Sequence, residues 1–258
     1  MPLPLLQAQK LSRHFGGLVA VNEVDFDIQS GEIVGLIGPN GAGKTTLFNM
    51  LCASMPATHG KIIFNGEDCS GLKAHDMAQR GMARTFQITS LFPHLSVFDN
   101  VLTGTYRQQK SGWWACIQRQ ARYRQEEADM AAQTADILDF VGLSDRQDDL
   151  AATLPYGDQR KLEIAIALAT QPKLLLLDEP AAGMNPDEGA KLVGMIKNIR
   201  QRGVTVMLVE HHMKVVMGVC DRVIVIANAQ KIAEGAPQHV ANHPEVIRVY
   251  LGRETVHA

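Results

Sequence analysis

Long hydrophobic segments are missing from this sequence of 258 residues. Its unbroken apolar runs are short, for example Leu174–Leu177, Val206–Val209 and Val223–Ala227. A membrane-spanning helix needs about 20 apolar residues, so the chain is not expected to form a channel itself. The opening Met1-Pro2-Leu3-Pro4 also lacks the positive flank and apolar core of a signal peptide. We therefore expect a cytoplasmic protein.

The sequence also lacks a basic excess and any pattern of paired cysteines. It contains 25 Lys and Arg residues and 27 Asp and Glu residues, which gives a net charge of −2. Nucleic-acid-binding proteins usually carry a strong basic excess, so we expect no nucleic-acid partner. The four cysteines contain no C-x-x-C pair, which favours reduced, structural thiols over a disulfide or a metal site.

Strand and helix patterns alternate in both terminal parts of the chain. The expected segments are strands 5–11, 21–28 and 32–37, helix 44–53, strand 61–65, strand 173–177, helix 188–202, strand 205–210, helix 213–219 and strand 222–227. A turn at Gly16-Gly17 is expected to join the first two strands, whereas residues 87–170 read as mainly helical. This alternation predicts an α/β fold with a mainly parallel sheet.

A glycine-rich loop follows the third expected strand and opens the first helix. Its residues are Gly38-Pro39-Asn40-Gly41-Ala42-Gly43-Lys44-Thr45, followed by Thr46. The pattern G-x-x-x-x-G-K-[ST] lets backbone N–H groups surround phosphates, and the positive end of the following helix points at them. Lys44 is expected to reach the β- and γ-phosphates, and the Thr45 hydroxyl to bind Mg²⁺. The loop therefore predicts nucleotide binding.

Two acids end the apolar strand at Leu174–Leu177. Asp178 and Glu179 follow it directly, and parallel strands bring their carboxyl ends to the same edge of a sheet. Beside a phosphate-binding loop, Asp178 is expected to hold Mg²⁺ and Glu179 to orient or deprotonate the attacking water.

Together these motifs resemble one family, the ATP-binding cassettes of ABC transporters, over nearly the whole chain. The further motifs occur in the family's order, namely Phe15, Arg84-Thr85-Phe86-Gln87, Leu154-Pro155-Tyr156-Gly157-Asp158-Gln159, Ala182-Gly183-Met184-Asn185 and Val209-Glu210-His211. The resemblance implies one cassette domain over residues 1–258. Its core and antiparallel β subdomain would comprise 1–86 and 171–258, with a helical subdomain at 87–170.

The resemblance also implies a role for each motif residue. Phe15 would stack on adenine, and residues 38–46 would bind the phosphates. Mg²⁺ would be held by Thr45, Gln87 and Asp178. Hydrolysis would depend on Glu179, His211 and Gln87. The signature segment Tyr156, Gly157, Asp158 and Gln159 would complete the ATP site of a partner cassette, whereas His212 is expected to face solvent.

A narrower resemblance is to the ATPases of branched-chain amino acid importers. It lies in the segments Arg84–Gln87, Tyr156–Arg160, Glu179–Pro186 and Val249–Gly252. It implies transmembrane permease subunits, a second and non-identical cassette, and indirectly a substrate-binding protein as partners. The chain would then lie peripherally on the cytoplasmic face of the inner membrane. A urea importer, a lipid-extracting exporter and a soluble cassette protein of translation or DNA repair are the alternatives.

Some residues depart from the family pattern. Pro155 stands where the family has the signature serine, Tyr156 replaces its first glycine, and Asn185 replaces the usual aspartate. These changes predict two unequal ATP sites in a pair of cassettes. The segment 88–101 is expected to dock a membrane partner. The basic segment 107–124 is either a membrane-facing surface or a solvated helix face.

Overall fold

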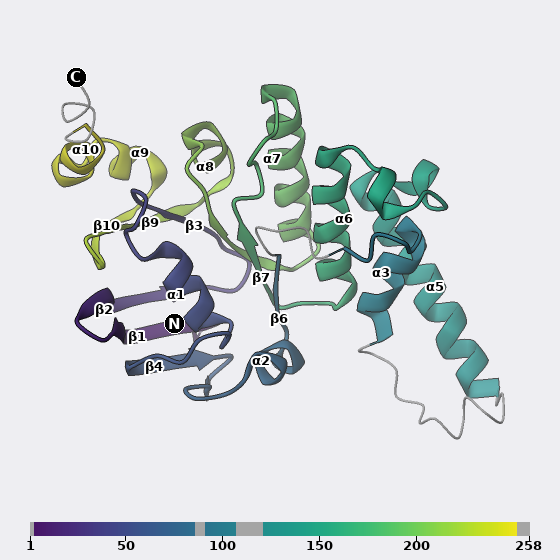
Figure 1. The fold of residues 1–258 in the computed structure, drawn as a ribbon, viewed down its shortest axis with the longest axis horizontal. Helices are drawn as coiled ribbons and strands as arrows, with labels where there is room; N and C mark the ends of the chain where they lie inside the picture. The colour runs from purple at the N-terminus through teal and green to yellow at the C-terminus, as the bar shows by residue number, and fades with distance from the viewer. Residues whose placement is uncertain (1–2, 86–90, 107–120, 252–258) are drawn as a thin grey trace. The chain divides into compact units, whose positions relative to one another are not determined.

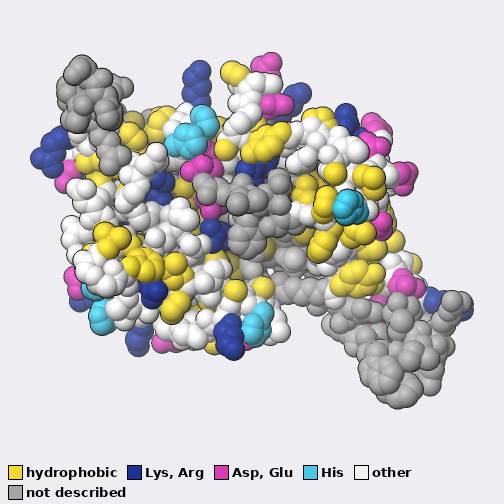
Figure 2. Space-filling view, viewed as in Figure 1, with side chains coloured by type: hydrophobic (Ala, Val, Ile, Leu, Met, Phe, Trp, Pro, Cys, Tyr) yellow, Lys and Arg dark blue, Asp and Glu magenta, His cyan; other side chains and the backbone are white. Residues whose placement is uncertain are grey.

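The computed structural model describes residues 3–85, 91–106 and 121–251, which belong to two compact units. The first unit comprises Met1–Arg84 with Lys173–Ala258, and the second comprises Thr85–Pro172. Within the described ranges, no helix is long and apolar enough to cross a membrane. On the face drawn in Figure 2, basic and acidic side chains are interspersed, in keeping with the nearly balanced charge.

An antiparallel sheet opens the first unit. Its strand order is β2-β1-β4-β5, formed by β1 (Leu6–Phe15), β2 (Leu18–Ile28), β4 (His59–Phe64) and β5 (Glu67–Asp68). The predicted pairing of the first two strands is confirmed, with the turn at Gly16, where φ is 57°. β1 extends four residues beyond the predicted end at Leu11, because pairing continues through bulges as far as Phe15 and Leu18.

A second sheet of six strands carries the parallel core. Its order is β10-β9-β3-β8-β7-β6, formed by β3 (Ile33–Ile37), β6 (Met82–Arg84), β7 (Leu174–Asp178), β8 (Thr205–Val209), β9 (Arg222–Ala227) and β10 (Gln230–Gly235). All neighbours pair in parallel except β10, which runs antiparallel to β9 at one edge. Every residue of β3, β7 and β8 is buried, as expected for strands covered on both faces.

Helices cover this sheet on both sides (Figure 1). Between the two sheets lies α1 (Lys44–Leu51), whose Leu47, Phe48 and Leu51 belong to the core cluster that contains residues of both sheets. The other face carries α7 (Pro186–Gln201) and α8 (Met213–Val219). Smaller helices complete the unit, namely α2 (Ala74–Arg80), α9 (Pro237–Ala241) and α10 (Pro244–Leu251).

The second unit is built on three mutually packed helices. They are α3 (Val97–Thr105), α5 (Ala121–Val141) and α6 (Tyr156–Ala169), with short 3₁₀ turns at Ser144–Arg146 and Ala151–Thr153. Ser96 caps the start of α3 by accepting a hydrogen bond from the Asp99 N–H at 2.9 Å. The α/β class with an antiparallel N-terminal sheet and a helical part is therefore confirmed.

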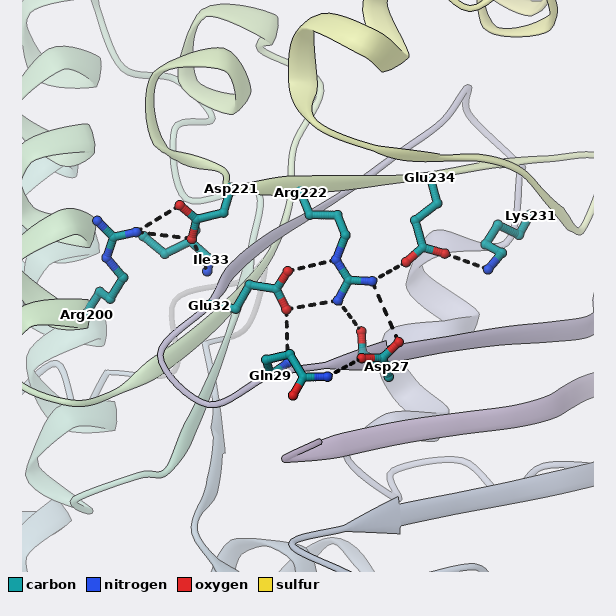
Figure 3. Close-up of polar contacts among 9 residues, drawn as sticks. All are labelled: Asp27, Gln29, Glu32, Ile33, Arg200, Asp221, Arg222, Lys231 and Glu234. Atoms are coloured by element: carbon teal, nitrogen blue, oxygen red, sulfur yellow. Dashed lines mark hydrogen bonds and ion pairs between the residues drawn. The ribbon is translucent and has the colours of Figure 1, made fainter. Parts of the chain in front are cut away.

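An arginine at the start of β9 joins the two sheets of the first unit (Figure 3). The Arg222 guanidinium donates to Glu32 Oε1 at 2.7 Å and Oε2 at 2.9 Å, to the Asp27 carbonyl at 2.6 Å, and to Glu234 on β10. These hydrogen bonds, above all those to Glu32, raise the pKa of Arg222 despite the burial that opposes its charge. Because this is a basic group with a raised pKa, its stabilisation is fully present below the ordinary pKa of an arginine, and therefore at neutral pH, and is lost only as the pH rises through the higher pKa of the folded state.

Replacing this arginine should destabilise the first unit. Arg222→Met leaves Glu32 and Glu234, and the Asp27 carboxylate 3.8 Å from the guanidinium, without their shared partner. We expect a loss of about 2–4 kcal/mol in the free energy of unfolding, measured with urea. Arg200→Met is the matched control, because Arg200 meets Asp221 in a more exposed pair worth about 0–1 kcal/mol. Equal losses for the two variants would contradict the role given to Arg222.

Candidate functional site

Three parallel strands end at one edge of the sheet of the first unit. In the register, Leu36 of β3 lies beside Val209 of β8, and Val209 lies beside Asp178 of β7. The segments that follow these strands are the glycine-rich loop, the Asp178-Glu179 pair and the Glu210-His211 pair. The three predicted motifs are therefore brought to the same edge, as the parallel direction of the strands requires.

The glycine-rich loop needs glycine at both of its ends. A Cβ at Gly38 would come within 2.1 Å of the Ile226 carbonyl oxygen, and a Cβ at Gly43 within 2.2 Å of the Ala20 carbonyl oxygen. Gly41 has a φ of 79°, in the left-handed region that favours glycine. The two ends of the loop are therefore packed against β9 and β2 too closely for any side chain. A glycine-rich loop held in this way before a helix fits the binding of phosphate by backbone N–H groups.

Lys44 is held inside this loop. Its ammonium donates to the carbonyl oxygens of Gly38 at 2.7 Å and Pro39 at 3.0 Å, and its residue is 9% exposed. Lys44 also begins α1, so the exposed Thr45 and the half-buried Thr46 lie in the first helical turn. The first turn of α1 thus contains a cation and two hydroxyl-bearing residues at the positive, N-terminal end of the helix.

The first acid of the pair has a buried cationic partner. Asp178 Oδ2 accepts from an Arg84 Nη at 2.8 Å, and the two side chains are 2% and 8% exposed. Arg84 ends β6 and also donates to Asn49 Oδ1 of α1 at 2.5 Å. Burial opposes the charge of Arg84, but its hydrogen bonds with Asp178 and Cys52 outweigh this and raise its pKa. Sequence reasoning noted Arg84 only as part of a motif.

The second acid sits in a strained turn. Glu179 has a φ of 47°, uncommon for a residue with a side chain, and its N–H donates to the Val209 carbonyl at 3.0 Å. Such backbone strain clusters at functional positions. Its Oε1 lies 3.8 Å from Nδ1 of His211, and the two side chains are 26% and 52% exposed. Both predicted hydrolytic groups are therefore neighbours that solvent can reach.

Glu210 and His212 were not singled out as site residues by the sequence. Glu210 is fully buried, and its Oε2 lies 3.2 Å from Nδ1 of His212, whose side chain is 45% exposed. His212 therefore faces solvent only in part. Ligand atoms of Glu210, His211 and His212 lie within 4.8 Å of one another, but both Glu210 oxygens already accept backbone N–H groups. This arrangement favours a structural carboxylate over a metal ligand.

Of two further predicted residues, Phe15 is exposed and Gln87 is not among the residues that the structure describes. Phe15 ends β1 with 42% exposure, and the Arg13 guanidinium lies 4.6 Å from its ring centroid. Gln87 lies outside the described residues, as do parts of the segments 88–101 and 107–124.

Tyr250 of α10 was unexpected near the loop. Burial raises the pKa of its hydroxyl, and a hydrogen bond with the Gly38 backbone partly offsets this.

The predicted signature residues begin α6 in the second unit. Pro155 precedes the helix, and the Tyr156 hydroxyl accepts from Arg160 at 2.8 and 3.0 Å. Asp158 in the first turn accepts from Lys161 at 2.7 Å, and the Gln159 amide donates to the Leu154 carbonyl at 2.9 Å. Gly157 lies between Tyr156 and Asp158 in the same turn. The segment is therefore the start of a helix, and its own side chains stabilise it.

Comparisons with known proteins point to one family. The model described as ABC transporter matches residues 21–182, and the model of the branched-chain amino acid ATP-binding cassette transporter matches residues 230–256. The chain is similar to the high-affinity branched-chain amino acid transport ATP-binding protein LivG of Escherichia coli K12, with 42% identity over 98% of this chain and 99% of that protein. It is also 40% identical to BraF of Pseudomonas aeruginosa PAO1, over the same shares of the two chains.

A solved structure agrees. The crystal structure of the ADP conformation of a cassette from an ABC transporter has a TM-score of 0.84 and 27% identity, covering 97% of this chain and all of that one. The edge that gathers the glycine-rich loop, the acid pair and His211 is thus found in a chain that belongs to the ATP-binding cassettes of ABC transporters.

Proposed function

We propose that this chain is the ATP-hydrolysing subunit of an importer for branched-chain amino acids. The observation that carries hydrolysis is the meeting of the phosphate-binding loop, Asp178, Glu179 and His211 at one sheet edge. The cargo class is supported by the similarity to LivG and BraF, which are named branched-chain amino acid transport ATP-binding proteins. It is also supported by the match of the C-terminal residues 230–256.

Nucleotide binding falls to the loop and the first turn of α1. The backbone of residues 38–43 and the Lys44 ammonium bind the phosphates, residues 44–46 face them from the helix start, and Phe15 stacks on adenine. Thr45 offers a hard oxygen atom of the kind that Mg²⁺ prefers, with Gln87 as a further donor. The Asp178 carboxylate is buried and bound to Arg84, so it would hold Mg²⁺ through water. The bound Mg²⁺–ATP supplies the γ-phosphoryl group and neutralises part of its charge.

Hydrolysis depends on the two exposed groups at the edge. Glu179 accepts the proton of the attacking water, and the strained turn fixes its carboxylate at the strand end. His211, 3.8 Å from that carboxylate, contacts the γ-phosphate side of the site. Lys44 holds positive charge against the phosphates, as phosphoryl transfer requires.

The second unit and the partner proteins complete the motor. We assign the two units to one cassette, in which residues 156–159 act on the ATP site of a second, non-identical cassette. The pair would bind transmembrane permease subunits at the inner face of the cell membrane and act indirectly with a substrate-binding protein.

Asn185 caps α7 by accepting from the N–H groups of Asp187 and Glu188, each at 3.0 Å.

The role of Glu179 can be tested by an isosteric change. Glu179→Gln removes the proton acceptor and should lower the ATPase rate by roughly 10²- to 10⁴-fold while ATP binding is preserved. The measurement is steady-state hydrolysis beside equilibrium binding of ATP. Glu67→Gln, at an exposed carboxylate of the same unit, should change neither quantity. Hydrolysis by Glu179→Gln at the wild-type rate would exclude Glu179 as the base.

The buried pair beneath the site predicts a loss of stability. Arg84→Met removes the cationic partner of the buried Asp178 carboxylate, which should cost about 3–5 kcal/mol of unfolding free energy in urea. Adding Asp178→Asn should recover part of that loss, because it removes the buried acidic group. Arg80→Met, at the more exposed pair with Glu67, should cost about 0–1 kcal/mol. A double variant no more stable than Arg84→Met would refute the pairing argument.

The cargo class requires a transport assay. In cells that lack this chain and any redundant leucine importer, the wild-type chain should restore uptake of labelled leucine, whereas Glu179→Gln should not. Uptake of lysine and urea should be the same with either chain. Leucine uptake that is independent of the chain would remove the cargo assignment and leave the ATPase proposal in place.

A further inference from the structure

Two loops carry the proposed hydrolytic groups, and one buried side chain joins them. Glu179 begins the loop after β7, and His211 lies in the loop after β8. Between the two loops lies the carboxylate of Glu210, which has no exposed surface. The mechanism proposed above gives Glu210 no role.

Each oxygen of this carboxylate holds a different loop. Oε1 accepts the N–H of Ala181, two residues after Glu179, at 2.8 Å. Oε2 accepts the N–H groups of His211 at 3.1 Å and His212 at 3.2 Å. The ring Nδ1 of His212 also lies 3.2 Å from Oε2. One rigid group therefore fixes the backbone on both sides of the Glu179–His211 pair.

The physical cost of this arrangement points to a function. A carboxylate without solvent contact is unfavourable unless hydrogen-bond donors compensate its charge. The donors to Glu210 among the described residues are mostly backbone N–H groups of the two loops. Those N–H groups would be satisfied equally by water if the loops were open to solvent. The carboxylate is thus placed where it restricts the loops, and small shifts of catalytic groups have large effects on rate.

We propose that Glu210 is a positioning residue that couples the loop of Glu179 to the loop of His211. Its carboxylate is buried, and it acts by holding the two groups at their mutual distance of 3.8 Å. The proposal rests on the proposed function, because it assigns Glu210 a part in the same hydrolysis.

The test is Glu210→Gln, which keeps the shape of the side chain and replaces one carboxylate oxygen by an NH₂ group. A glutamine has one acceptor oxygen, so it can hold either Ala181 or the two histidine N–H groups, while its NH₂ group opposes the other loop. In the full chain with its permease partners, we expect kcat for ATP hydrolysis to fall roughly 10- to 100-fold. The KM for ATP should change less than about twofold, since the phosphate-binding loop is untouched.

Amide hydrogen exchange gives a readout that does not depend on catalysis. Without nucleotide, the amides of Ala181, His211 and His212 should exchange faster in Glu210→Gln than in the wild type, at one loop or at both. Glu32→Gln is the matched control, because Glu32 also accepts a backbone N–H, from Gln29 at 2.9 Å, and is 16% exposed. It should lower stability without changing kcat or exchange at the three amides.

Two results would overturn the proposal. One is a wild-type kcat in Glu210→Gln, and the other is a fall in kcat with unchanged exchange at all three amides. A combined variant separates positioning from general damage: with Glu179→Gln already present, Glu210→Gln should slow the residual hydrolysis by much less than 10-fold. If Glu210→Gln does not fold, Glu210→Asp keeps the charge but shortens its reach, and the same kcat and exchange criteria apply.

The proposed function can fail separately. If Glu179→Gln hydrolyses ATP at the wild-type rate, Glu179 is not the base, whatever happens at Glu210. If Glu179→Gln is slow but Glu210→Gln is not, the base stands and the positioning role falls.

Discussion

The register of the central parallel strands is the constraint on which the site depends. β3, β8 and β7 are five residues each and are buried throughout. Because side chains alternate along a strand, a shift of one residue in the pairing of two strands would turn every side chain to the opposite face of the sheet. The observed register ends the three strands together and so places Gly38, Asp178 and Glu210 at one edge. The arrangement of groups at the edge is therefore set by the pairing and packing of buried strand residues.

Three charges beside this edge are compensated within the protein. Asp178 is paired with Arg84, the Lys44 ammonium is bound by loop carbonyls, and Glu210 is surrounded by backbone N–H groups. Two of these contacts, Arg84 with Asp178 and the Ala181 N–H with Glu210, also tie together segments that are distant in the sequence. Such preorganised charges and dipoles stabilise a reacting phosphate without rearrangement, which is how an enzyme uses a region of low dielectric.

Local patterns in the sequence sufficed for much of this arrangement. Strand Arg222–Ala227 and helix Met213–Val219 have the predicted bounds, because their apolar patterns and flanking residues are local signals. The edge strand β10 escaped prediction, since none of its residues is buried and only Ile232 and Ala233 are hydrophobic. The contact between Arg84 and Asp178 joins residues 94 positions apart, and the Glu210 bonds to Ala181 span 29 positions. No single-sequence pattern encodes such pairings, because they follow from the sheet order.

The departure at Asn185 gains a physical meaning from the structure. Its side chain accepts two N–H groups at the start of α7, and Glu188 completes a capping box. Asparagine and aspartate cap helices about equally well, so the fold of this loop does not need the aspartate that the family usually has. What changes is the charge, since a negative group beside a helix N-terminus is removed. The loop therefore keeps its helix cap and loses one negative charge where asparagine stands.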